Sequence, residues 1–188
     1  MEPEDLKGSV GFVIISPEPN IARLKDTVRS IRANFGEGCG IACSVGKGIK
    51  KDQLDEFKAV CRSFRGGETV MSLINNGLKK SSGDGWKILV MEGARVPNSL
   101  LKRYCRWIQS EKDVLYPIVM NQDIEGRPLS VLTDFEESTL NGMMLHASFF
   151  KDVGDFSDNP IGVSKKFWGM DAEKNGAKFK AILGVKVI

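Results

Sequence analysis

The sequence predicts one α/β domain, a three-layer sandwich with a mostly parallel central sheet, helices on both faces and a small antiparallel hairpin in the second half. Three observations predict this fold class. Apolar runs typical of buried strands alternate with segments whose apolar residues recur every three or four positions. The turn residues Asp123 to Pro128 separate two short apolar segments. The 188 residues suffice for one core but not for two full domains.

The chain begins with a strand and a helix. The apolar run Val10 to Ile15 predicts a strand buried on both faces, and Ser16 to Pro19 predicts the loop after it. Asn20 is a favourable N-cap residue, and Gly36 ends the helix that begins there. The buried face of this helix is expected to comprise Ile21, Leu24, Val28, Ile31 and Phe35.

The same alternation continues through the first half. Gly40 to Val45 predicts a second strand, and Trp86 to Met91 predicts another buried strand. A helix begins around Thr69 and ends in the turn Ser81 to Gly85, and Pro97 suits the first turn of the next helix. The helix after the second strand is expected to bury Leu54, Phe57 and Cys61.

The second half has a different pattern. Val114 to Met120 and Leu129 to Leu132 predict the two strands of the hairpin, and Gly142 to Ala147 predicts a further strand. A helix is expected at Ser164 to Asn175, and the chain closes with the apolar segment Ala181 to Ile188. This half therefore departs from simple strand–helix alternation.

Composition excludes several classes of function. The 27 basic and 24 acidic residues give a net charge of +3, and the basic residues are dispersed, so we expect no nucleic-acid partner. No apolar run reaches the roughly 18 residues of a membrane span, and Met1 to Asp5 is acidic where a signal peptide is basic. We therefore expect a cytoplasmic protein without a membrane span. One histidine and four scattered cysteines match no zinc pattern.

Ligands of such sheets bind beyond the carboxyl ends of the parallel strands. The loops at those ends are Ser16 to Asn20, Ser44 to Lys47 and Glu92 to Arg95. We expect these three loops to surround one crevice, and a guanidinium such as that of Arg95 suits phosphate oxygens there.

Three segments in register carry a resemblance to a known family: Val13-Ile14-Ile15-Ser16-Pro17 with Asn20, Asn75-Asn76-Gly77 followed by Ser81-Ser82-Gly83-Asp84-Gly85, and Ile88-Leu89-Val90-Met91-Glu92 through Pro97. In their order and spacing the chain resembles glycosyltransferase family 2, the inverting nucleotide-diphospho-sugar transferases of GT-A fold. The resemblance implies a single domain over residues 1–188, with a nucleotide-binding half at about 8–97 and an acceptor-side half at about 98–188. The donor-binding residues are then expected to be Ser16, Pro17, Asn20, Ser44, Lys47, Asn76 and Arg95.

The acidic residues of that family are largely absent. Glu92-Gly93-Ala94 stands where the family has the metal-binding Asp-x-Asp motif, so Glu92 is the one candidate metal ligand. The resemblance implies Mn²⁺ or Mg²⁺, held weakly by this single carboxylate, or no metal. The acid expected near Ser44 to Gly46 is missing, and Ser164 and Lys165 stand where the family has its catalytic base.

Three residues remain as candidates for the chemistry. His146 lies where the resembling enzymes line the acceptor pocket, and its imidazole titrates near neutrality, although a structural histidine is the alternative. Asp171 is the other candidate base, and Trp168 is a candidate acceptor-binding residue that stacks on a sugar ring. The candidate functions are an inverting transfer from a nucleotide-diphosphate sugar to an unknown acceptor, a catalytically inactive domain for glycan or protein recognition, and a structural module without a ligand.

Overall fold

The computed structural model describes residues 9–122, 128–132, 135 and 138–183. A seven-stranded sheet runs through the molecule in the order β3-β2-β1-β4-β8-β5-β9, and β6 and β7 form a separate antiparallel pair. The strands are β1 (Val10–Ser16), β2 (Gly40–Gly46), β3 (Arg62–Gly67), β4 (Trp86–Met91), β5 (Asp113–Pro117), β6 (Val119–Gln122), β7 (Pro128–Leu132), β8 (Met144–His146) and β9 (Lys178–Ile182).

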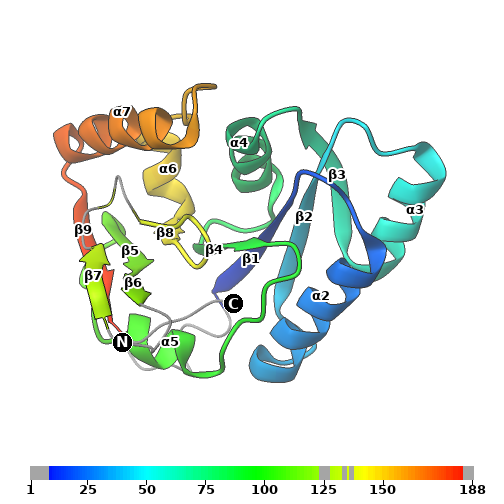
Figure 1. The fold of residues 1–188 in the computed structure, drawn as a ribbon, viewed down its shortest axis with the longest axis horizontal. Helices are drawn as coiled ribbons and strands as arrows, with labels where there is room; N and C mark the ends of the chain where they lie inside the picture. Colours follow the sequence, from blue (N-terminus) through cyan, green and yellow to red (C-terminus); the bar gives the residue numbers. More distant parts are fainter. Residues whose placement is uncertain (1–8, 123–127, 133–134, 136–137, 184–188) are drawn as a thin grey trace.

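Helices cover both faces of the sheet, which makes three layers (Figure 1). One face packs against α2 (Ile21–Phe35), α3 (Lys51–Val60) and α5 (Ser99–Tyr104), and the other against α4 (Val70–Lys80), α6 (Ala147–Val153) and α7 (Ile161–Lys174). Successive residues of β1 enter opposite cores, because side chains alternate along a strand: Phe12 and Ile14 face the first, Val13 and Ile15 the second. The predicted fold class is confirmed.

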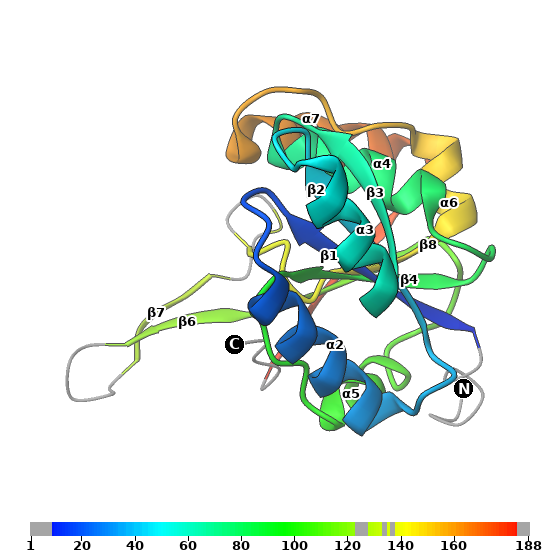
Figure 2. The same cartoon turned by 90° about the vertical axis from the view of Figure 1, so that its right-hand side faces the viewer.

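Strand directions decide which loops meet. β3, β2, β1 and β4 are mutually parallel, whereas β8 runs antiparallel to β4 and β5, and β9 is parallel to β5. The carboxyl ends of β1, β2, β4 and β5 therefore lie along one edge of the sheet. Figure 2 shows the β6–β7 pair projecting from the body on this side.

The first predicted helix is confirmed in detail. The side chain of Asn20 accepts hydrogen bonds from the backbone N–H groups of Ala22 (3.0 Å) and Arg23 (3.1 Å), which makes it the N-cap of α2. Gly36 follows the helix with φ +93°, a conformation that glycine adopts at little cost, and its N–H donates to the carbonyl of Arg32.

Two elements were absent from the sequence prediction. β3 is an edge strand of Arg-Ser-Phe-Arg-Gly-Gly, and its polar composition hides the strand pattern because one side of it faces solvent. A Cβ at Gly66 would clash with Ser44 and Leu73, so glycine lets this strand approach its neighbours closely. The second missed element is α6, a helix of only seven residues that follows β8 directly.

The predicted strand Val114 to Met120 is in fact two strands. β5 belongs to the main sheet, and β6 pairs with β7 as the predicted hairpin. α7 begins at Ile161, three residues before the predicted start, and β9 begins at Lys178, before the predicted apolar segment. Residues 123–127 of the predicted turn and 184–188 of the closing segment lie outside the described residues. Among the described helices, none has the length and apolar character needed to cross a bilayer.

Candidate functional site

Two cavities lie at the carboxyl edge of the sheet, and Arg23 lines both of them. The first, of about 430 Å³, lies beyond β4 and is lined by Arg23, Asp26, Met91, Glu92, Gly93, Ala94, Arg95 and Asn141. The second, of about 360 Å³, is lined by Glu18, Pro19, Asn20, Arg23, Gly48, Ile49 and Gln53. Their volumes fall within the range of small-molecule sites. We call the two cavities together the Arg23 crevice.

Glu92 joins the end of β4 to the start of α2. Its Oε2 accepts a hydrogen bond from the hydroxyl of Ser16, and its Oε1 accepts one from the backbone N–H of Asn20 at 2.8 Å. Its own backbone N–H donates to the carbonyl of Ile15 at 3.0 Å. Burial raises the pKa of the Glu92 carboxyl, while the hydrogen bonds from Ser16 and Asn20 and the charge of Arg23 act in the opposite direction.

Arg23 is the main residue of this crevice that the sequence analysis missed. It stands in the first turn of α2, where the positive end of the helix dipole disfavours a cation, and no acidic residue stands in that turn. Its side chain is exposed and passes close to Gly93. Within the described part of the chain, no hydrogen bond or ion pair of 4.0 Å or less engages its guanidinium. A basic residue in an unfavourable helical position was the signal available in the sequence.

The other charged groups of the first cavity differ in their pairing. Arg95 is exposed and, among the described residues, has no hydrogen bond or ion pair. Asp26 forms an ion pair with Arg29 at 3.0 Å, and Asn141 accepts a hydrogen bond from the backbone N–H of Met91 at 2.9 Å. The cavity therefore presents two unengaged guanidinium groups, whereas both of its carboxylates already have partners.

The remaining predicted donor residues of the β1 and β2 loops lie beside the cavities. Ser16 is fully buried and bonded to Glu92, and Pro17 is exposed. Lys47 pairs with Glu68 at 3.1 Å. A Cβ at Gly46 would clash with the carbonyl oxygen of Pro17, so the backbone leaves no room for a side chain at that position. This close approach gives a physical reason for the missing acid at the end of β2.

Ser44 and Asn76 lie outside the Arg23 crevice. The hydroxyl of Ser44 is buried on the α4 face of the sheet, close to Gly66 and Gly77, and has no hydrogen-bond partner in the described structure. The amide of Asn76 donates to the carbonyl of Gly66 and to that of Ser72 (3.0 Å), so it fastens α4 to β3. The expectation that both residues border the crevice is corrected, because their side chains face the interior beneath α4.

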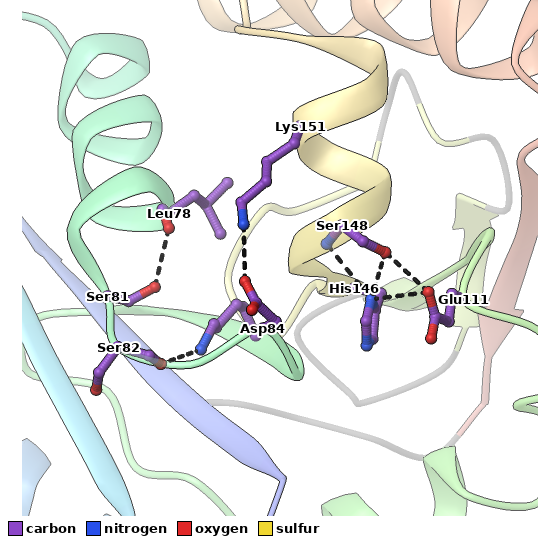
Figure 3. A network of polar contacts seen from close by, with 9 residues as sticks. Leu78, Ser81, Ser82, Asp84, Glu111, His146, Ser148 and Lys151 are labelled. Atoms are coloured by element: carbon purple, nitrogen blue, oxygen red, sulfur yellow. Dashed lines mark hydrogen bonds and ion pairs between the residues drawn. The ribbon is translucent and has the colours of Figure 1, made fainter.

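His146 lies at the opposite edge of the sheet. It pairs with Trp86, the first residue of β4, so the length of that strand separates it from Glu92. Figure 3 shows its network: Nδ1 lies 2.7 Å from the hydroxyl of Ser148, and that hydroxyl donates to Glu111 at 2.9 Å. The ring also accepts from the backbone N–H of Ser148 and caps α6. Burial lowers the pKa of His146.

Both site candidates on α7 also lie elsewhere. Asp171 is exposed and pairs with Lys174 at 3.0 Å. Trp168 is 3% exposed, its ring is stacked on Phe156 at 4.5 Å between centroids, and its indole N–H donates to the carbonyl of Gly154. The predicted sugar-stacking face of Trp168 is therefore covered by the core. The structure does not bring Glu92, Arg95, His146 and Asp171 into one pocket.

The two residues at the expected positions of the catalytic base are buried. The hydroxyl of Ser164 donates to the carbonyl of Ser157 at 2.7 Å. The ammonium group of Lys165 donates to the carbonyl of Ser138 and lies 5.4 Å from the ring centre of Phe135. Neither residue supplies a carboxylate, and both support local packing.

The described residues of the Arg23 crevice do not make a divalent-metal site. Glu92, the single predicted ligand, already accepts a hydrogen bond on each carboxylate oxygen, and the guanidinium of Arg23 contributes positive charge beside it. No cluster of three or more His, Cys, Asp or Glu side chains suited to a metal occurs in the part of the chain that the structure describes. Mg²⁺ sites often use one or two protein carboxylates together with waters and phosphate oxygens, but here the carboxylates of Glu92 and Asp26 each have a partner already.

The fold of this chain is similar to that of solved structures with the GT-A-like architecture. TarS of S. aureus is similar over 95% of this chain with a TM-score of 0.60 and 13% identity. The mannosyltransferase PcManGT of Pyrobaculum calidifontis, solved with GDP-Man and Mn²⁺, is similar over 94% with a TM-score of 0.62 and 8% identity. A 4-diphosphocytidyl-2C-methyl-D-erythritol synthase is similar over 93% with a TM-score of 0.56 and 14% identity.

These similarities concern the fold, since every identity is low. The chain spans 36% of the length of TarS, 56% of PcManGT and 88% of the synthase. TarS residues 1–349 have also been solved with UDP-GlcNAc and with UDP. No protein-family model matches the sequence. No curated protein matches it either.

Proposed function

We propose that this protein binds a nucleotide-diphosphate sugar in the Arg23 crevice. The observation that carries the proposal is the pair of unengaged arginines, Arg23 and Arg95, in a cavity at the carboxyl edge of the sheet. Guanidinium groups form paired hydrogen bonds with phosphate oxygens, and this edge is where open α/β sheets bind their ligands. Structures of similar fold have been solved with UDP-GlcNAc, UDP and GDP-Man.

The two cavities suit different parts of a nucleotide-diphosphate sugar, because their linings differ in chemistry. The cavity beyond β4 carries both arginines and suits the diphosphate. The neighbouring cavity is lined by Pro19 and Gln53, which offer apolar contact and an amide for the nucleoside. Arg23 borders both cavities, so one ligand can extend from the base to the phosphates past a single side chain.

Sugar transfer is the second part of the proposal and has less support. An inverting displacement at the anomeric carbon needs a general base within reach of the acceptor hydroxyl. His146 lies at the far edge of the sheet, and Asp171 is paired with Lys174 on the surface of α7. We therefore favour binding of a nucleotide sugar as the function. Two alternatives remain for its role: a working transferase, or a catalytically inactive domain for glycan or protein recognition.

Thermal unfolding with UDP, UDP-GlcNAc and GDP-mannose tests donor binding. A ligand at one hundred times its dissociation constant stabilises the native state by about 2.7 kcal/mol. In a domain of this size that corresponds to about 5–11 °C in Tm. Absence of a shift with every nucleotide at millimolar concentration would contradict the proposal. Release of nucleoside diphosphate, measured in the same samples, separates a transferase from a binding domain.

A further inference from the structure

Resting on the proposed donor binding, we propose that the Arg23 crevice binds its diphosphate without a divalent metal, with Arg23 and Arg95 neutralising the phosphates. The two arginines would then do what a metal cofactor does in other diphosphate sites. Three features of the described structure support it: the engagement of Glu92, the placement of the two arginines, and the capping of α2.

Glu92 has a structural task at the site. Ser16 is fully buried, and its hydroxyl bonds to Glu92 Oε2. If the carboxylate turned away to ligate a metal, this hydroxyl would lose its acceptor in a place that water does not reach. Leaving a buried donor unpaired is unfavourable. The second oxygen accepts the backbone N–H of Asn20, so movement of Glu92 would also release the start of α2.

The charges of the cavity oppose a cation and favour an anion. Arg23 and Arg95 line the cavity beside Glu92, and the charge of Arg23 acts to lower the pKa of that carboxyl, although burial has the larger effect and raises it. Asp26, the other carboxylate there, is paired with Arg29. A divalent cation would therefore meet two arginines and no unpaired carboxylate, whereas a diphosphate would meet two groups with several N–H donors each.

Most backbone amides at the start of α2 are already engaged: those of Ala22, Arg23 and Leu24 all donate to Asn20. Helix N-termini often bind phosphate through unpaired N–H groups. Here the side chain of Asn20 already accepts from Ala22 and Arg23, and the N–H of Asn20 itself is bonded to Glu92. Most amides at this helix end are therefore occupied, so the side chains of Arg23 and Arg95 should supply most of the contacts to an anion, and their loss should weaken binding directly.

The experiment measures the dissociation constants of UDP and GDP by titration calorimetry, in EDTA and in Mn²⁺. Wild-type protein should bind the better of the two nucleotides in EDTA, with less than about a twofold change on adding Mn²⁺. Arg23→Ala and Arg95→Ala should each weaken binding about 10-fold to 100-fold, as loss of a charge-assisted hydrogen bond predicts. Arg23→Lys, which keeps the charge but not the planar fork, should lie between wild type and Arg23→Ala.

Lys25→Ala is the matched control, because Lys25 is an exposed cation on the same helix that lines neither cavity of the crevice and pairs with Glu56. It should bind like wild type. Binding that requires Mn²⁺ and is lost in Glu92→Gln would overturn the metal-free inference while leaving the proposed function standing. Absence of binding in both buffers would overturn the proposed function, and the inference with it. Equal loss in Lys25→Ala would refute the assignment to Arg23 and Arg95.

Discussion

Replacing Glu92 with alanine should destabilise the metal-free protein. The hydroxyl of Ser16 is fully buried and would lose its acceptor, which costs about 1–3 kcal/mol. The N–H of Asn20 is at an exposed residue and can bond to water instead, so it adds little. Alanine also removes a half-buried charge. The free-energy cost of burying that charge, which raises the pKa of Glu92, is therefore partly recovered. We therefore expect a net loss of about 1–2 kcal/mol, or about 2–8 °C in Tm.

The loss can be measured by urea unfolding in EDTA, followed by tryptophan fluorescence, because Trp86 and Trp168 are buried in the folded state. The double variant Ser16→Ala/Glu92→Ala removes the orphaned hydroxyl, so its loss should be smaller than the sum of the single losses by at least about 0.5 kcal/mol. A carboxylate that served only as a metal ligand would behave differently. If Glu92→Ala were as stable as wild type in EDTA, or more stable, the structural role derived for Glu92 would be wrong.

Three further variants test other parts of the structure, each by urea unfolding. Trp168→Ala should cost about 3–5 kcal/mol because its ring is buried, whereas Phe167→Ala, at a side chain 53% exposed, should cost less than about 1 kcal/mol. Gly46→Ala should cost about 1–3 kcal/mol because its Cβ meets backbone, whereas Gly48→Ala, with open space, should change stability by less than about 0.5 kcal/mol. Burial lowers the pKa of His146 in the folded state below its unfolded-state pKa of 6.5. The folded state is therefore stabilised at pH values above 6.5, where the ring is neutral. This stabilisation is lost as the pH falls through the folded-state pKa. Between pH 7.5 and 5.5, wild type should therefore lose more stability than His146→Gln, and equal losses would contradict the burial argument.

Much of the fold could be predicted because its signals are local. The run Val10 to Ile15 is apolar at every position, and Asn20 and Gly36 mark the ends of α2 with cap chemistry that depends only on nearby backbone. β3 could not be predicted in this way. Its residues Arg62 and Arg65 face solvent at an edge, and its glycines are needed for contacts with residues distant in sequence. Only the assembled sheet makes that segment a strand.

The candidate site shows the same division. Strand-end topology correctly predicted that the loops at Asn20 and Glu92 meet, since that follows from strand direction. The sequence could not indicate that Glu92 is engaged by Ser16, because this contact joins residues 76 positions apart. Nor could it separate buried Trp168 from exposed Phe167, since α7 has apolar residues around most of its circumference.

The reversed direction of β8 has a consequence for how this domain can vary. Asn141, just before the strand, contacts the carboxyl edge through Met91, whereas His146, at its end, lies at the amino edge. The five-residue step from Asn141 to His146 thus crosses the sheet from its carboxyl edge to its amino edge. Substitutions on one side of this short strand can reshape the crevice while those on the other alter the cap of α6. A substitution at Asn141 should therefore act on the crevice and one at His146 on the start of α6, although only a short strand separates the two residues.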